Sequence, residues 1–349
     1  MKKALATILA LVMALSVTTM AWADDVAKIG NTGYATLKAA IEHVADGETI
    51  VLTADVNNGD GIVVVSGKNF TLDFAGHTYT ITQNVVGSTG TENQCFQLLR
   101  DSTITMKDGA IVANCTGAKM IIQNYCNLTL DNMKLDATVG DNNVGYVVSN
   151  NCGNVFIKNG TTITAKTTGV AFDVYGGFQN YGDVSVTLEA GATVNGKVEV
   201  ARDTGTQNKN TLTVTGGTVN GELVVTENEK TKVAVTGGTF STDVTEYLAE
   251  GKILQKNGDT YTAVTNSAIT SGTYTSEPTV PSGYKATKND DGTWTVSKVS
   301  YYYYQPTTDT KTTDTKGSPK TFDAGIALYV GMALTSAAGV AFVGKKRED

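Results

Sequence analysis

The sequence predicts an all-β protein built as a parallel β-helix, and three observations favour this fold class. Glycine is abundant, at 37 residues, whereas proline occurs only 4 times, which is typical of many short strands joined by tight turns. The segment TLTVTGGTVNGELVV (211–225) recurs with variation between residues 70 and 244. A second series of strands lies between these repeats and keeps the same period of about 25 residues, as stacked coils require.

The repeats follow one rule, in which an apolar residue is followed two positions later by another and, three positions after that, by a turn residue. Most of them carry glycine at the turn, as at Gly191 and Gly217. Because one coil buries little apolar surface alone, the pattern predicts about seven stacked coils. A β-sandwich also explains short strands, but not a turn that recurs at one offset. The repeats begin at Leu72, Ile104, Leu128, Val155, Val186, Leu212 and Val233.

The first residues predict a secretion signal followed by a cap. Lys2 and Lys3 precede an apolar run, and Ala23 ends a small-residue cleavage pattern, so we expect residues 1–23 to be removed. A signal anchor is the alternative, although the run is short for a membrane span. Residues 34–44 have helical apolar spacing behind Thr36 as N-cap, which predicts a short helix over the open end of a β-helix formed by residues 24–244.

Three segments of different composition follow the last repeat. Residues 245–298 contain two modules with the hairpin turn signals Asn257-Gly258 and Asp291-Gly292. Residues 299–317 are rich in Thr, Asp and Lys without apolar periodicity, which indicates a linker. Residues 318–349 contain SPKTF, an uncharged stretch at 324–343 and the basic sequence KKR. This last stretch is long enough for a transmembrane helix with a cytoplasmic basic tail.

Residues 34–244 resemble the right-handed parallel β-helix proteins of the pectin-lyase-like type. The resemblance is carried by YATLKAAIEHVADGETIVL, TLDFAGHTYTI, TITMKDGAI and TLTVTGGTV. It implies a fold rather than an activity, since polysaccharide lyases, glycoside hydrolases, adhesins and passenger domains share that fold. The two modules that follow resemble those in surface proteins of gut Firmicutes.

The C-terminal segment resembles the LPXTG-type sorting signals of Gram-positive bacteria. The resemblance implies a sortase whose cysteine attacks the carbonyl of Thr321 and passes the acyl group to a peptidoglycan amine, with Pro319 fixing an extended bend. Ser318 stands where Leu is usual and Phe322 where Gly is expected, so an uncleaved membrane anchor is the alternative. Both outcomes predict an exported protein held at the cell surface.

Aromatic residues of the middle coils predict a platform on which glycans stack. For each of these aromatic residues, the alternative is that its side chain packs in the core. We found no catalytic cluster in the sequence and therefore predict an adhesin or a binding or structural module, with a polysaccharide lyase or glycoside hydrolase and a passive spacer as alternatives. A net charge of −7 argues against nucleic acid as a partner. The aromatic residues are Tyr125, Tyr146, Phe172, Tyr175, Phe178 and Tyr181.

The cysteines indicate one candidate disulfide. Aligning MIIQNYC with YVVSNNC places Cys126 and Cys152 on adjacent strands, within the Cα separation that a disulfide needs. Buried, stacked thiols are the alternative. The same alignment places Asn124 beside Asn150, which predicts a hydrogen-bonded amide pair.

Other polar residues concern a metal site and salt bridges. Asp136 and Asp141 flank an Asn-rich loop with oxygen ligands suitable for Ca²⁺, but a solvated turn is the commoner structure for such a loop, and we predict no metal site and no cofactor. Arg100 and Arg202 each precede an aspartate, which suggests salt bridges within loops.

Overall fold

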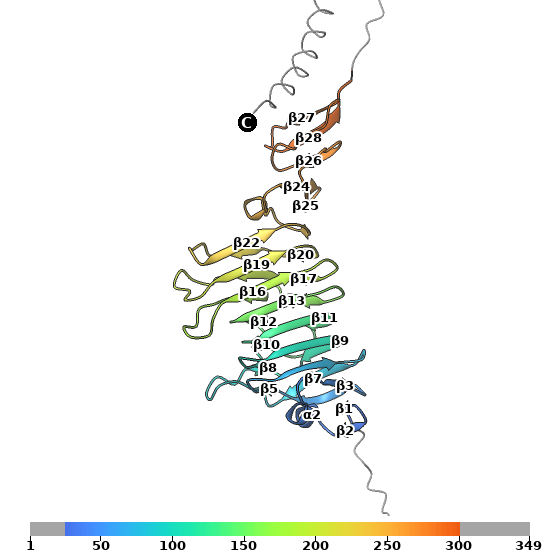
Figure 1. Cartoon of the computed structure of the whole chain (residues 1–349), viewed down its shortest axis with the longest axis vertical. Helices are drawn as coiled ribbons and strands as arrows, with labels where there is room; N and C mark the ends of the chain where they lie inside the picture. The colour runs from blue at the N-terminus through green and yellow to red at the C-terminus, as the bar shows by residue number, and fades with distance from the viewer. Residues whose placement is uncertain (1–24, 301–349) are drawn as a thin grey trace, which may run out of the picture. The chain divides into compact units, whose positions relative to one another are not determined.

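The computed structural model describes residues 25–300, and this part of the chain is an all-β protein (Figure 1). Its strands form one mixed sheet of 21 strands and a second, wholly parallel sheet of 7 strands. No helix among the described residues is long and apolar enough to cross a membrane. The predicted secretion signal, the sorting signal and most of the linker lie outside the described residues.

The large sheet contains two ladders of parallel strands, each paired in chain order. Long strands β9 (Thr103–Ala113) and β11 (Asn127–Asp136) contribute their first halves to one ladder and their second halves to the other. The first ladder also contains β3 (Thr49–Leu52), β6 (Asn69–Asp73), β13 (Gly153–Ile157), β16 (Val184–Leu188), β19 (Asn210–Val214) and β22 (Thr231–Val235). The second contains β4 (Val56–Asp60), β7 (Thr78–Gln83), β14 (Thr162–Thr164), β17 (Thr193–Asn195), β20 (Thr218–Asn220) and β23 (Thr239–Phe240).

The second sheet is the third ladder. Its strands are β5 (Ile62–Val64), β8 (Gln94–Leu98), β10 (Met120–Asn124), β12 (Tyr146–Asn150), β15 (Val170–Val174), β18 (Lys197–Val200) and β21 (Leu223–Val225). The chain therefore visits the three ladders in turn and returns to the first one strand further along. This parallel order is compatible with the predicted β-helix and does not fit a β-sandwich, whose sheets are antiparallel.

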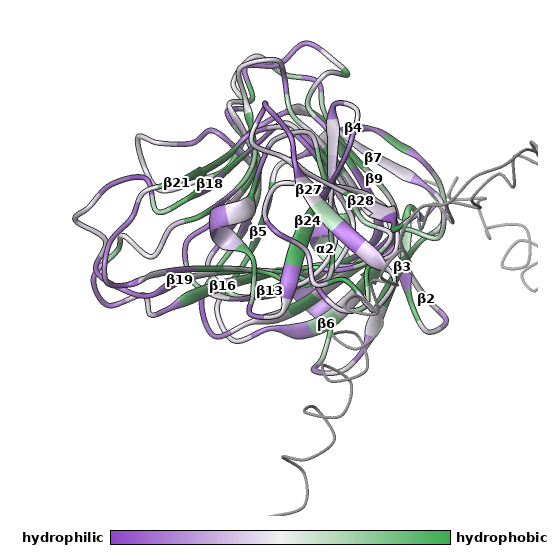
Figure 2. Ribbon diagram, turned by 90° about the horizontal axis from the view of Figure 1, so that it is seen from above, coloured by the Kyte–Doolittle hydropathy of each residue, from purple (hydrophilic) through white to green (hydrophobic). Residues whose placement is uncertain are grey.

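Apolar residues at alternate positions of the strands form the core between the ladders. Leu212 and Val214 of β19 pair with Val186 and Leu188 of β16, and all four side chains are buried. Figure 2, which looks down on the molecule, shows hydrophobic residues concentrated in the strands rather than in the connecting loops. Each fully buried side chain of this size stabilises the fold by about 1.5–3 kcal/mol.

The strand register that the repeat rule predicts is confirmed from Ile104 onward and is wrong for the first repeat. The residues that begin successive repeats from Ile104 to Val233 are direct partners in the first ladder. Ile104, however, pairs with Phe70 rather than with Leu72. The reason is the turn, because Ala75 (φ 50°) and Gly76 (φ 87°) adopt left-handed conformations and lie two positions and one position before the expected turn at His77.

The N-terminal cap contains the predicted helix and a hairpin that the sequence did not indicate. Helix α2 (Leu37–His43) begins after Thr36, whose hydroxyl accepts the Ala39 N–H at 3.1 Å, and it buries Leu37 and Ile41 against the core. Strands β1 (Ala27–Ile29) and β2 (Thr32–Tyr34) pair with each other, and β1 also pairs antiparallel with β3. Strand β1 therefore covers the edge of the first strand in the ladder.

Both predicted hairpins are present after the last ladder strands. They are β24 (Lys252–Asn257) with β25 (Thr260–Thr265), and β27 (Tyr284–Lys288) with β28 (Trp294–Lys298). A 3₁₀ turn, η1 (Thr245–Tyr247), precedes them, and β26 (Gly272–Tyr274) joins β24 to β28. A second small core contains Ile253, Ile269, Tyr274 and Val296.

Candidate functional site

The predicted aromatic residues come together beside the third ladder. Tyr125 and Tyr175 follow β10 and β15, and each donates its backbone N–H to the preceding strand of the ladder. The register of β10, β12 and β15 places Asn151 between them. Phe178 and Tyr181 belong to the segment that follows Tyr175, and this segment folds back toward Tyr125, since both of its rings lie against the ring of Tyr125.

Four of these rings form what we call the aromatic cluster: Tyr125, Tyr175, Phe178 and Tyr181. The ring centroids of Tyr125 and Tyr181 are 5.0 Å apart, and the Phe178 centroid lies 5.6–6.2 Å from those of the other three. These separations are typical of tilted and edge-to-face aromatic pairs. Phe178 and Tyr181 are each 40% exposed, so the cluster presents ring surface to solvent.

Arg100 borders the aromatic cluster. Its guanidinium carbon lies 5.0 Å from the Tyr181 ring centroid, and Nη1 donates to the carbonyl oxygen of Asn180 at 2.9 Å. A hollow of about 280 Å³ lies between this arginine and the rings of Tyr125 and Tyr181. Asp101 and Asp183 also line that hollow.

Arg202 links the aromatic cluster to Tyr146. Its guanidinium carbon lies 4.2 Å from the ring centroid of Tyr175 and 5.2 Å from that of Tyr146. The same side chain, 33% exposed, places Nη2 3.5 Å from Oδ2 of Asp173. Cation–π contacts of this kind contribute about 0.5–2 kcal/mol, and the carboxylate fixes the direction of the guanidinium.

Asp173 is a buried carboxyl group in the otherwise apolar strand β15. Its side chain is 1% exposed, and its two oxygens accept the Asn150 N–H at 2.6 Å and the Ser149 hydroxyl at 3.2 Å. Burial raises the pKa of Asp173 to about 7, although Arg202 and these two donors act in the opposite direction. A carboxyl group held by fixed donors is well suited to orient Arg202.

A space of about 260 Å³, which we call the acidic hollow, is lined by Tyr146, Glu199 and Arg202. Glu199 is the direct strand partner of Asp173; it accepts the Tyr146 hydroxyl at 3.1 Å and pairs with Lys197 at 2.5 Å. Asp203 accepts the Tyr175 hydroxyl at 2.8 Å.

The predicted salt bridges within loops are wrong. Arg202 pairs with Asp173, far from it in sequence, while Asp203 binds the Tyr175 hydroxyl. Arg100 contacts the Tyr181 ring and a backbone carbonyl. Sequence reasoning also missed Asp173 and Glu199, although a single carboxylate in an apolar strand such as VAFDV was an available signal. Phe172, 1% exposed, belongs to the core.

The four cysteines are free thiols in the structure. Cys126 donates to Oδ1 of Asn124 at 3.2 Å, and Cys152 donates to the carbonyl oxygen of Tyr125 at 2.7 Å. Burial raises the pKa of Cys126 to about 12 and that of Cys152 to about 11. The Asn124 amide donates to that of Asn150 at 3.3 Å, which confirms the predicted pair. A disulfide between Cys126 and Cys152 stays a prediction.

The Asn-rich loop is closed by its own hydrogen bonds. The amide of Asn142 donates to the carbonyl oxygens of Ala113 and Val139 at 3.0 and 3.1 Å. Asp136 accepts the Thr138 N–H at 2.9 Å, and the backbone N–H of Asp141 donates to Asn114. Within residues 25–300 no group of three or more His, Cys, Asp or Glu side chains has the arrangement of a metal site.

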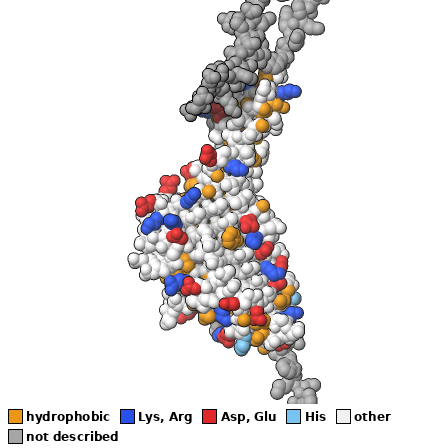
Figure 3. Space-filling model, in the orientation of Figure 1, with side chains coloured by type: hydrophobic (Ala, Val, Ile, Leu, Met, Phe, Trp, Pro, Cys, Tyr) orange, Lys and Arg blue, Asp and Glu red, His pale blue; other side chains and the backbone are white. Residues whose placement is uncertain are grey.

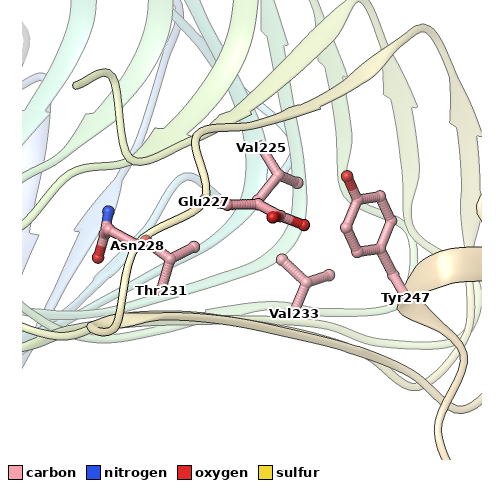
Figure 4. Close-up of a pocket in the computed structure, with 6 residues that line it drawn as sticks. All are labelled: Val225, Glu227, Asn228, Thr231, Val233 and Tyr247. Carbon is pink, nitrogen blue, oxygen red and sulfur yellow. The ribbon is translucent and has the colours of Figure 1, made fainter. Parts of the chain in front are cut away.

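Another hollow, of about 450 Å³, lies where the third ladder ends among the described residues (Figure 4). It is lined by Val225 of β21, Val233 of β22, Tyr247 of η1 and Glu227. Strand β21 pairs on one side only, with β18. We therefore interpret this hollow as the end of the strand stack, where no further strand covers the apolar side chains.

Charges are mixed on the surface seen in Figure 3, where Lys and Arg side chains alternate with Asp and Glu. That face presents no broad basic area of the kind that a phosphate backbone requires. The comparisons with known proteins found no matching family model, no significantly similar curated protein and no significantly similar solved structure. The geometry around the aromatic cluster and the acidic hollow is therefore the basis on which a function can be inferred.

Proposed function

We propose that this chain is a cell-surface protein that binds glycans through the aromatic cluster, presented by a right-handed parallel β-helix of about seven coils. The exposed rings of Phe178 and Tyr181 carry the proposal. Sugars expose C–H faces that pack on aromatic rings, and their hydroxyl groups need polar partners close by. Arg100, Arg202 and Glu199 supply such partners within the same region.

The side chains of the aromatic cluster are held in place before any ligand binds. The Asn208 amide donates to the carbonyl oxygens of Gly176 and Phe178 at 3.1 and 2.8 Å. These contacts tie the segment that carries Phe178 and Tyr181 to the segment that follows β18. A pre-organised loop loses less conformational entropy on binding, and so more of the contact energy appears as affinity.

A polysaccharide lyase or glycoside hydrolase is the second candidate, because Asp173 and Glu199 lie on adjacent strands and the pKa of Asp173 is about 7. A catalytic acid or base must reach the substrate directly or through one water. Asp173 is 1% exposed and both its oxygens are engaged, while Glu199 is occupied by Lys197 and Tyr146. This arrangement favours binding over catalysis.

Binding is tested with the full chain on an array of neutral and acidic glycans. Replacing both Phe178 and Tyr181 by Ala is expected to weaken retention at least tenfold. Phe156→Ala is the matched control, because Phe156 is 39% exposed and lies in β13 of the first ladder. New reducing or unsaturated ends in the glycan would establish catalysis instead. Retention of no glycan by the wild type would favour a passive spacer.

We propose further that the protein is exported with cleavage after Ala23 and linked to peptidoglycan at Thr321, with Pro319 shaping the sorting motif. The support is the order of motif, apolar stretch and basic tail in residues 318–349. Thr321→Ala is expected to abolish release of the protein by wall-digesting enzymes, because it changes the residue whose carbonyl the sortase attacks. If wild-type protein is never wall-linked, the alternative of an uncleaved membrane anchor replaces the sortase proposal.

A further inference from the structure

The C-terminal end of the strand stack is covered at two of its three ladders. In the first ladder, Leu248 forms a parallel bridge with Val235 of β22, and the Ala249 N–H donates to the Val235 carbonyl oxygen at 2.9 Å. In the second ladder, β25 pairs antiparallel with β23. In the third ladder, β21 pairs with β18 and with no other strand within residues 25–300. Among the described strands, β21 is therefore the last of its ladder and has a free edge.

The free edge of β21 presents backbone groups that could bind a further strand. The Thr226 N–H donates to the Val200 carbonyl oxygen of β18 at 2.9 Å, and the Glu222 carbonyl oxygen accepts from β18 at the same distance. Because backbone groups point to opposite sides at successive residues of a strand, Leu223 and Val225 direct their N–H and C=O groups away from β18. No hydrogen bond from another described residue reaches these groups. Unpaired groups in a row are a template for strand addition.

The hollow of about 450 Å³ at the end of the third ladder lies beside this edge (Figure 4). Val225, Val233 and Tyr247 line it, and all three are only partly buried where they pack against the core. Val225 is the strand partner of the buried Val200, so its side chain faces the interior. A strand added beside β21 would place every second side chain over the hollow. An apolar side chain there would bury the lining as a further coil of the stack would.

Negative charge lies beside the apolar part of the hollow. Among the described residues that line it, Glu227 is the one charged residue, and its carboxylate faces the same space as the Tyr247 ring in Figure 4. The pKa of Tyr247 is raised to about 12, chiefly by burial and further by the nearby carboxylates of Glu246 and Glu227. Lys230, the nearest cation in the sequence, donates to the Gln207 carbonyl oxygen at 2.9 Å. The hollow therefore suits a positively charged group next to an apolar one.

From the free edge, the hollow and its carboxylate, we propose that β21 is a docking site for an extended basic peptide segment of another protein, which adds a strand to the third ladder. One apolar residue of the partner enters the hollow over Val225 and Val233, and a Lys or Arg two positions away pairs with Glu227. The offset arises because alternate residues of a strand share one face, and Glu227 lies two positions beyond Val225. Main-chain hydrogen bonds to Leu223 and Val225 hold the segment. The site uses no residue of the aromatic cluster and is independent of the proposed glycan binding.

The probe is the peptide acetyl-Thr-Lys-Thr-Leu-Thr-Lys-Thr-amide. A lysine lies two positions from the leucine on either side, so both strand directions present one to Glu227. We expect the peptide to bind the full chain and to slow amide exchange in residues 223–225, measured by mass spectrometry, because their free N–H groups become hydrogen-bonded. The same peptide with glutamate in place of both lysines should bind more weakly by about tenfold or more. Methylation of the three central amide nitrogens keeps the side chains and should abolish the protection from exchange.

Two variants separate the charge from the strand edge. Glu227→Gln should lower the affinity for the lysine peptide by about threefold or more. Glu229→Gln is the matched control, because Glu229 is an exposed carboxylate that does not line the hollow, and it should leave the affinity unchanged. Val225→Pro removes an N–H that points away from β18, and proline is tolerated at such edge positions. This variant should keep its circular dichroism spectrum and lose binding of the peptide.

Three outcomes would overturn the proposal. Absence of protection by the lysine peptide, or equal binding of the glutamate peptide, excludes the basic partner. Protection of residues 223–225 without peptide at low protein concentration shows that another part of the same chain covers the edge. Protection without peptide that appears only as the protein concentration rises assigns the edge to a second copy of the chain.

Discussion

Ionisation of Asp173 is expected to destabilise the folded chain. The pKa of this carboxyl group is raised from 3.8 to about 7, chiefly because its side chain is buried. Arg202, Ser149 and Asn150 face it with favourable interactions, and Glu199 on the adjacent strand faces it with an unfavourable one. The net effect favours the neutral form in the folded protein.

The sign and the size of this effect on the free energy of unfolding follow from proton linkage. Between pH 4 and 7 the folded state keeps the Asp173 proton while the unfolded state has lost it, so raising the pH lowers the free energy of unfolding. Raising the pKa from 3.8 to about 7 corresponds to about 4 kcal/mol of stability. This contribution is fully present below pH 4, falls as the pH rises, and is lost above pH 7.

Asp173→Asn should remove this pH dependence, because the amide does not ionise. Urea unfolding of the variant and the wild type at pH 4 and pH 8 should show that the variant gains about 4 kcal/mol relative to the wild type across that interval. Stacked strands can open locally, so amide exchange in β15 provides a second measurement. Asp203→Asn, at an exposed carboxylate, is the control. A difference between variant and wild type that stays constant from pH 4 to pH 8 would refute the reasoning.

Three further predictions concern the core, a turn and the thiols. Phe172→Ala should lower the free energy of unfolding by about 3–5 kcal/mol in urea, because Phe172 is 1% exposed and leaves a cavity. Gly217→Ala should lower the free energy of unfolding by about 2 kcal/mol or more, because the added Cβ would lie 2.8 Å from two carbonyl oxygens. Gly251→Ala is the control and should lower it by about 1 kcal/mol, because Gly251 has a similar φ but open space around it. Equal losses of stability in thermal melts would contradict this. Iodoacetamide at pH 7.5 should modify Cys115 before Cys126, as followed by peptide mass analysis, because the interaction with the Cys95 thiol lowers the pKa of Cys115 while burial raises that of Cys126 to about 12. Faster modification of Cys126 would contradict this.

The ladders could be predicted from the sequence because their signal is periodic. Apolar alternation and the recurrent turn found the strand partners from Ile104 to Val233. The first repeat failed because its left-handed turn lies at Ala75 and Gly76, before the position that the repeat rule expects. The hairpin β1–β2 was missed because its strands have only three residues each. Short edge strands carry too few residues for a pattern to show.

The aromatic residues of the site were predictable by composition, whereas the charged ones were not. Tyr125 and Tyr181 are far apart in sequence, and only the fold-back of the segment after Tyr175 brings their rings to 5.0 Å. Arg202 was assigned to its sequence neighbour, yet stacking of β15 on β18 gives it Asp173 as partner. Local spacing cannot predict such pairs, because they depend on the register between strands.

The position of the candidate site follows from where the chain departs from the regular repeat. Between β19 and β20 the chain turns tightly at Gly216 and Gly217, and no side chain there extends far from the ladders. After β15 and β18 it makes longer excursions, and Asn208 of the second is hydrogen-bonded to the first. Substitutions in the core and at the turns should therefore change the free energy of unfolding. Substitutions of Phe178 and Tyr181, which are 40% exposed, should instead change glycan binding and have little effect on unfolding. If substitutions of Phe178 and Tyr181 lowered the free energy of unfolding as much as core substitutions do, the proposed division between scaffold and binding loops would be wrong.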